Sequence, residues 1–175
     1  MAKALTSHKE QDLNRAESDI LSRLGNESFD FGALAAVSNI YRAATTIRNH
    51  MEQTVLNSHD LSWGAFTVLW VLWIWGDQET RHLASEAGVT KGTLTGIVKT
   101  LEKRGLVQRS SHDEDRRLVV VSLTRKGTAT ISKLFPEFNR HEGIVTASLT
   151  ESQRDELAGC LRTIIRTVED STKVN

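Results

Sequence analysis

Apolar side chains recur every three or four positions between residues 31 and 57, as they do along one face of an α-helix. The stripe consists of Leu34, Val37, Tyr41, Ala44, Ile47 or Arg48, Met51 and Val55. The polar run Asn57-Ser58-His59-Asp60 interrupts it. The pattern predicts one long helix over 31–57, and a shorter amphipathic stretch at 9–24 predicts an added helix before it.

Residues 63–75 read W-G-A-F-T-V-L-W-V-L-W-I-W and hold all four tryptophans of the chain. This run is apolar on nearly every face, so it predicts a helix buried from several sides, with Ser62 as its N-cap. It is too short to span a bilayer and Gly64 interrupts it, so we expect no membrane segment here.

Residues 80–104 show the pattern of two short helices joined by a tight turn. The first would bury Leu83, Ala84 and Ala87 and end at Gly88, because glycine adopts a positive φ at little cost. Thr90 is the expected N-cap of the second helix. The apolar stripe of that helix is Leu94, Ile97, Val98 and Leu101, and its opposite face carries Lys91, Thr93, Thr95, Gly96 and Lys99. Small and cationic side chains suit a helix that enters the major groove of DNA.

After this helix pair, residues 106–109 predict one strand of a β-hairpin, and residues 118–123, which are rich in β-branched side chains, predict its partner. The polar tip between them contains Arg116 and Arg117, which could enter a minor groove. Asp115 lies two residues before Arg117, so it could orient that arginine. Residues 79–127 hold ten cations and six acids, hence +4 within a chain of formal net charge zero, which is a modest electrostatic footprint for DNA.

The remaining stretch predicts two more helices. Thr124 is the expected cap of the first, which would run from 125 to about 148 and bend at Pro136. Thr150 and Gln153 form a predicted capping box for the second. Its apolar face consists of Leu157, Leu161, Ile164, Ile165 and Val168.

The order of helix, wing and following helix resembles the MarR family of winged helix-turn-helix transcriptional regulators over roughly residues 31–168. The most specific motifs are L-E-K-R-G-L-V, D-E-D-R-R and S-L-T-R-K-G. The resemblance implies that Arg117 reaches the minor groove, that Asp115 pairs with it, and that Thr93, Thr95 and Lys99 lie on the recognition helix. We expect Lys91 and Arg116 to contribute to the same DNA surface.

The predicted fold is therefore mostly α with a small β wing, in a subunit that forms one domain overall. We expect residues 1–60 to form the added helix and a long dimerisation helix, 61–127 the DNA-binding lobe, and 128–175 the C-terminal dimerisation helices. The apolar stripes of the first and last helices exceed what a small winged-helix domain needs, which favours a homodimer. Two-fold symmetry would place two recognition helices about one DNA turn apart, on a pseudo-palindromic site of double-stranded DNA. We expect a repressor in the cytoplasm.

Small-molecule sensing is the preferred hypothesis for regulation, because the resemblance implies phenolic carboxylate ligands in a crevice between the dimer helices and the DNA-binding lobe. The candidate lining residues are Tyr41, Arg42, Arg48, Trp63, Phe66 and Trp70. An arginine would meet a carboxylate and the rings would stack on the ligand, although the arginines could also be ordinary solvated charges. The added N-terminal helix resembles the urate-responsive branch of the family. Ile20, Thr67 and Gly96 stand where that branch has its Trp, Asp and Arg, so we do not expect urate.

Four alternatives remain. Catalysis is disfavoured, because the six histidines form no H-E-x-x-H and the chain has no G-x-S-x-G, phosphate-binding or dinucleotide-binding loop. A metal sensor would need His50, His59 and His141 to meet, and we expect neither a metal nor a cofactor. A redox sensor would need the single cysteine, Cys160, to be reactive, whereas a buried or interface thiol is typically inert. The fold could also serve only as a protein-interaction module.

Overall fold

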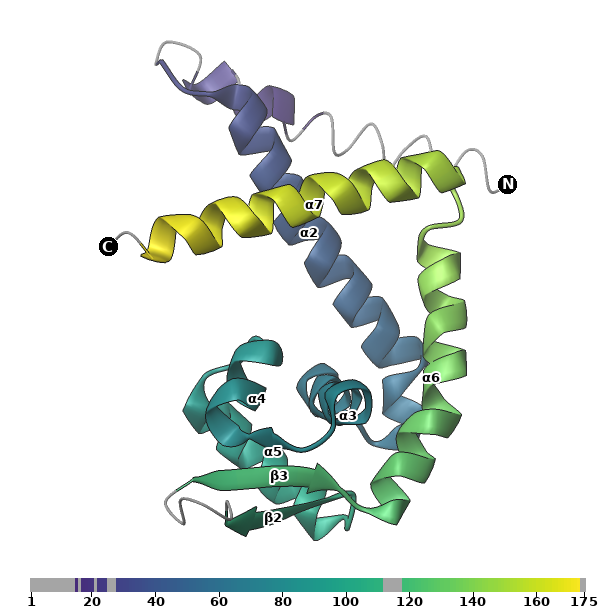
Figure 1. The fold of residues 1–175 in the computed structure, drawn as a ribbon. Helices are drawn as coiled ribbons and strands as arrows, with labels where there is room; N and C mark the ends of the chain where they lie inside the picture. Colours follow the sequence, from purple (N-terminus) through teal and green to yellow (C-terminus); the bar gives the residue numbers. More distant parts are fainter. Residues whose placement is uncertain (1–14, 16, 21, 25–27, 112–117, 174–175) are drawn as a thin grey trace. The chain divides into compact units, whose positions relative to one another are not determined.

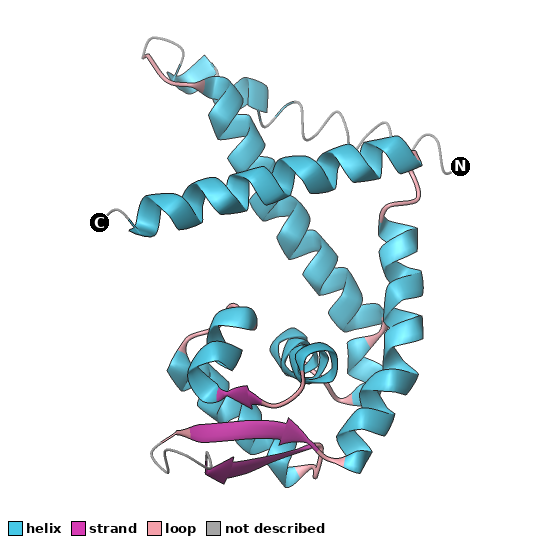
Figure 2. Ribbon diagram, viewed as in Figure 1, coloured by secondary structure: helices cyan, strands magenta, loops and turns pink. Residues whose placement is uncertain are grey.

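The computed structural model of the protein describes residues 15, 17–20, 22–24, 28–111 and 118–173 (Figure 1). Helices dominate it, and the strands form one small sheet (Figure 2). The elements are α2 (Phe31–Thr54), the 3₁₀ helix η1 (Leu56–His59), α3 (Trp63–Trp75), β1 (Gln78–Glu79), α4 (Thr80–Glu86), α5 (Lys91–Lys103), β2 (Val107–Ser111), β3 (Val119–Leu123), α6 (Arg125–Val145) and α7 (Glu151–Lys173). The chain divides into two compact units, 1–48 and 49–175. None of the described helices is long and apolar enough to cross a membrane.

In the first unit, residues 15, 17–20 and 22–24 are helical, as expected of the added N-terminal helix. This segment contacts α2 through Asn39, whose Nδ2 donates to Glu17 Oε1 over 2.8 Å. Asp30 begins α2, because its carboxylate accepts from the Ala33 N–H. The predicted apolar stripe is largely exposed here, with Tyr41 73% accessible.

In the second unit, α2 ends at Thr54, earlier than predicted. The backbone continues as η1, which Asp60 closes in the left-handed conformation at φ 52°. Six of the thirteen residues of α3 are buried, and Trp63, Trp70 and Trp73 pack partly buried against the same core. Ser62 caps α3 by accepting from the Ala65 N–H over 3.2 Å. The predicted central helix and its cap are confirmed.

The wing is a three-stranded antiparallel sheet with the order β1-β3-β2. The predicted hairpin is confirmed, and Val107 pairs with Leu123 while Ser111 pairs with Val119. The prediction lacked β1, in which Gln78 and Glu79 pair with Val121 and Val120. Two polar residues carry no alternating pattern, so only their backbone hydrogen bonds mark them as a strand.

The junction between the wing and α6 is tightly packed. Thr124 caps α6, because its hydroxyl accepts from the Gly127 N–H over 3.0 Å. The Thr124 N–H donates to Leu106 O over 3.1 Å. A Cβ added to Gly127 would lie 2.0 Å from the same oxygen, so the first turn of α6 touches the wing backbone where a side chain has no room.

The C-terminal helices agree with the predicted elements. α6 runs through Pro136 as one helix and ends at Val145, so the proline does not split it, and the bend expected there stays a prediction. The capping box of α7 is confirmed: the Thr150 N–H donates to Gln153 Oε1 over 2.9 Å, and the Gln153 N–H donates to Thr150 Oγ1 over 3.2 Å. Leu157, Ile164, Ile165 and Val168 on α7 are exposed in the single chain.

Candidate nucleic-acid interface

The recognition helix α5 presents one apolar and one polar face. Leu94, Val98 and Leu101 are buried against the core. Lys91, Thr93, Thr95 and Lys99 are all exposed. Between them, a Cβ added at Gly96 would meet nothing within 4 Å. The face is therefore open down to the helix backbone, and a double helix could approach it closely.

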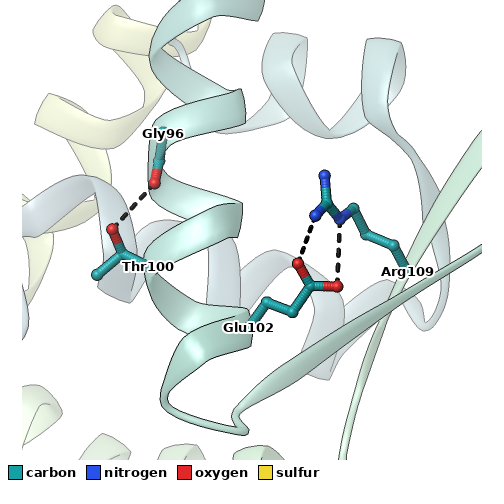
Figure 3. Close-up of polar contacts among 4 residues, drawn as sticks. All are labelled: Gly96, Thr100, Glu102 and Arg109. Carbon is teal, nitrogen blue, oxygen red and sulfur yellow. Dashed lines mark hydrogen bonds and ion pairs between the residues drawn. The ribbon is translucent and has the colours of Figure 1, made fainter.

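The turn before α5 matches the prediction. Gly88 has φ 62°, and Thr90 caps α5 by accepting from the Thr93 N–H over 3.2 Å. Farther along the helix, the Thr95 hydroxyl donates to Lys91 O over 2.9 Å. The Thr100 hydroxyl donates in the same way to Gly96 O over 3.0 Å (Figure 3). The threonine side chains thus lie close against the helix and add little height to its exposed face.

An ion pair connects α5 to β2 of the wing, and the sequence prediction did not include it. Arg109 Nε donates to Glu102 Oε1 over 3.2 Å, and Arg109 Nη2 pairs with Glu102 Oε2 (Figure 3). The hydrogen bond from Arg109 lowers the pKa of Glu102 below 4.5, and the same bond raises the pKa of Arg109. The signal in the sequence was an acid at the end of an otherwise cationic face, seven residues before an arginine.

A hollow of about 170 Å³ lies between α5 and the wing. Its lining consists of Thr80, Lys91, Leu94, Thr95, Val98, Arg109 and Val119. Two of the predicted DNA-facing residues, Lys91 and Thr95, therefore border the wing as well as the exposed face.

The C-terminal end of α5 is anchored at two further points. The Arg104 guanidinium donates to the carbonyls of His59, over 2.9 Å, and of Asp60. Lys126 Nζ donates to Arg104 O over 2.8 Å. The recognition helix is thereby fixed to the connection before α3 and to the first turn of α6. The predicted tip residues Asp115, Arg116 and Arg117 lie outside the described residues.

A second candidate site is an aromatic cavity of about 320 Å³ between α3 and α6. Its lining consists of Trp63, Phe66, Thr67, Trp70, Phe135, Phe138 and Glu142. It brings together three of the six predicted ligand residues, whereas Tyr41, Arg42 and Arg48 lie exposed on α2 in the first unit. Phe66 and Phe138 stack with centroids 4.0 Å apart. The sequence reasoning missed Phe135 and Phe138, although their spacing of three placed them on one helix face.

Among the described residues, the three histidines that a metal sensor would need do not form one site. His50 Nε2 and His141 Nδ1 lie 3.4 Å apart, but His59 instead contacts Glu137 at 3.6 Å. Within the described ranges, no group of three or more His, Cys, Asp or Glu residues could hold a metal ion. Cys160 is exposed on α7 rather than buried within the subunit.

Residues 61–119 match the model of the MarR family. The HTH-type transcriptional regulator YwaE of Bacillus subtilis (strain 168), itself described as uncharacterized, is 40% identical over 161 residues, which cover 90% of this chain and 94% of that protein. BpsR of Bordetella bronchiseptica, whose DNA binding is described as regulated by 6-hydroxynicotinic acid, superposes with a TM-score of 0.68 at 24% identity over 74% of this chain and 97% of its own. NadR in complex with 4-hydroxyphenylacetate superposes with a TM-score of 0.63 at 23% identity over 72% of this chain and 89% of its own.

The two structural likenesses concern the fold, and they agree with the helix, turn, helix and wing described above. The identity to the Bacillus regulator extends over nearly the whole of both chains. This chain belongs to the MarR family and is a DNA-binding transcriptional regulator with a winged helix-turn-helix fold.

Proposed function

We propose that the protein is a homodimeric repressor that binds a pseudo-palindromic operator and is released by a small aromatic ligand. The observation that carries the proposal is the exposed polar face of α5, where Lys91, Thr93, Thr95 and Lys99 surround an open glycine. We assign these four side chains to the major groove. Cationic and hydroxyl groups there can meet phosphates and base edges.

The wing is assigned to the adjacent minor groove. Arg116 and Arg117 would enter it, and Asp115 would orient Arg117. This assignment rests on the motif D-E-D-R-R and its place between β2 and β3. The minor groove has a negative potential that attracts guanidinium groups, so arginine suits this position.

Dimerisation is supported by apolar side chains that the single chain leaves uncovered. On α7, Ile165 is 55% and Val168 57% accessible, and on α2 Val37 is also exposed. Burying apolar area of this kind stabilises an association. We assign residues 1–60 and 128–175 to the dimer and 61–127 to DNA binding.

Ligand release is supported by the cavity between α3 and α6, whose rings suit a flat molecule. The two structural neighbours are described with 6-hydroxynicotinic acid and 4-hydroxyphenylacetate, both aromatic. Here the charged lining residue is Glu142, which would repel a carboxylate and accept a hydrogen bond from a phenol. We therefore favour a neutral phenol for the part of the cavity near Glu142.

Two other regulatory functions can be tested against this one. A redox-responsive regulator of the same fold would act through Cys160, which is accessible on α7, and peroxide would then release the DNA of wild type but not of Cys160→Ser. A protein-interaction module would bind its partner with little salt dependence, because apolar interfaces release few counterions.

The deciding measurement is fluorescence anisotropy on the DNA upstream of the protein's own gene, across a salt series. We expect binding that weakens steeply with salt, and a loss of about 1–3 kcal/mol in Arg117→Ala if that arginine reads the groove. Lys133→Ala, which removes an exposed cation of α6 that is not assigned to the DNA surface, is the matched control. Equal affinity for random DNA, unchanged by Arg117→Ala, would contradict operator recognition.

A further inference from the structure

We propose that Glu102 and Arg109 are a positioning pair that sets the wing against the recognition helix, so that both elements meet the DNA in one fixed orientation. Neither residue is assigned to DNA contact above. Glu102 lies in the last turns of α5, and Arg109 lies in the middle of β2. The two residues flank the turn at Gly105, where φ is 68°. The proposal rests on the DNA-binding orientation proposed for α5 and the wing.

The geometry of the contact constrains rotation as well as distance. Arg109 engages both oxygens of the Glu102 carboxylate, through Nε and through Nη2. Two roughly parallel N–H···O contacts from a planar guanidinium fix the angle between the groups, which one contact does not. The contact between Glu102 and Arg109 thereby restrains bending of the chain at the Gly105 turn, which joins α5 to β2.

The location of the pair connects the residues that face the DNA. Arg109 shares the face of β2 with the buried Val107, two positions before it, and so points toward α5 rather than away from it. It lines the hollow between helix and wing together with Lys91, Thr95 and Val119. A tilt of the wing about β2 would open this hollow and move the wing relative to Lys91 and Thr95.

The charges argue against a simple phosphate contact by Arg109. Glu102 engages the guanidinium at two points, and its carboxylate places a negative charge on a helix that otherwise exposes Lys91, Lys99 and Lys103. A carboxylate at this place repels phosphate, so for affinity alone it is unfavourable. Its presence is explained if it holds Arg109, and through it the wing. The side chain of Arg109 is 41% accessible and that of Glu102 is 36% accessible. Exposed ion pairs contribute little to folding stability, so we expect loss of this pair to lower the affinity for DNA rather than the melting temperature.

The test compares Glu102→Gln, Arg109→Gln and the reversed double variant Glu102→Arg with Arg109→Glu. We expect each single variant to lose roughly fivefold in operator affinity and the reversed pair to recover most of it. The salt slope should match that of wild type, because no phosphate contact is lost. The matched control is Glu79→Gln on β1, which removes the same charge and for which no ion pair is found among the described residues. It should retain or slightly raise affinity.

A readout without DNA separates this proposal from the proposed function. Amide hydrogen exchange in β2 should be faster in both single variants than in wild type and in Glu79→Gln, since the strand would be held less firmly. If wild type bound no operator but exchange responded in this way, operator binding would be wrong and the restraint of the wing would stand. If Glu102→Gln bound DNA more tightly, while Arg109→Gln bound less tightly with a salt slope lower by about one, Arg109 would be a phosphate ligand and the positioning role would be rejected. Unchanged affinity together with unchanged exchange would also reject it.

Discussion

Gly127→Ala should be among the most destabilising single-methyl additions in the DNA-binding lobe. The new Cβ would lie 2.0 Å from Leu106 O, whereas ordinary contact begins at 3.4 Å, so the backbones must separate by about 1.4 Å, the difference of the two. The obstructing atom is a backbone carbonyl, which cannot rotate away. That carbonyl accepts hydrogen bonds from the N–H and the hydroxyl of Thr124, at 3.1 and 3.3 Å, and both would stretch.

The expected loss of stability is the sum of the costs of overpacking and of weakened hydrogen bonds, less the gain in helix propensity. Overpacking of this kind costs about 1–3 kcal/mol and each weakened hydrogen bond about 1 kcal/mol, while alanine regains up to about 1 kcal/mol of helix propensity. The net loss in the free energy of unfolding is about 2–4 kcal/mol, which for a chain of this length lowers the melting temperature by roughly 4–16 °C. Urea denaturation followed by circular dichroism, at one fixed protein concentration, measures it.

Gly96→Ala is the matched control, because it makes the same substitution in a helix where the added Cβ meets nothing within 4 Å. It should stabilise the protein by about 0.5–1 kcal/mol, since alanine favours the helix. If Gly127→Ala unfolded at the same urea concentration as Gly96→Ala, the argument from close packing would be refuted.

Three further predictions concern the cap, the ion pair and the dimer. Thr90→Ala removes the acceptor for the Thr93 N–H and should cost about 1 kcal/mol in urea denaturation, whereas Thr90→Ser should cost little. Because the pKa of Glu102 is lowered in the folded state, the contribution of its pair with Arg109 is present above the ordinary pKa of a glutamate and is lost as the pH falls through the lowered value. The ratio of operator affinities between wild type and Arg109→Gln should accordingly stay constant from pH 8 to about pH 5.5. A ratio that changed within this range would contradict a lowered pKa of Glu102. Ile165→Asp should shift the protein to monomer in analytical ultracentrifugation, because it places a charge on the uncovered face of α7. A variant that sedimented as wild type would place the interface elsewhere.

The elements that could be predicted from the sequence are those with local physical causes. Gly88 and Gly105 both have positive φ, and Thr90, Thr124 and Thr150 all cap helices through their own hydroxyls. Each of these features depends on a few consecutive residues, so the sequence pattern contains them.

The features that could not be predicted depend on contacts between distant segments. β1 exists because Gln78 and Glu79 meet β3, and neither residue favours a strand. The Arg104 contacts to the carbonyls of His59 and Asp60 join residues more than forty positions apart. The aromatic cavity needs α6 beside α3, so two of its five aromatic residues, Phe135 and Phe138, could not be assigned before that packing was known.

The hydrogen bonds that the threonines make to their own helix decide what those hydroxyls can offer a base pair. Thr95 donates its hydrogen to Lys91 O and Thr100 donates its hydrogen to Gly96 O. While these bonds hold, each oxygen turned outward can only accept. In the major groove the hydrogen-bond donors on base edges are the amino groups of adenine and cytosine, whereas guanine presents two acceptors. If α5 enters the major groove as proposed, the hydroxyls of Thr95 and Thr100 would accept from amino groups of bases, and the lysines of the helix would donate to guanine or to phosphate.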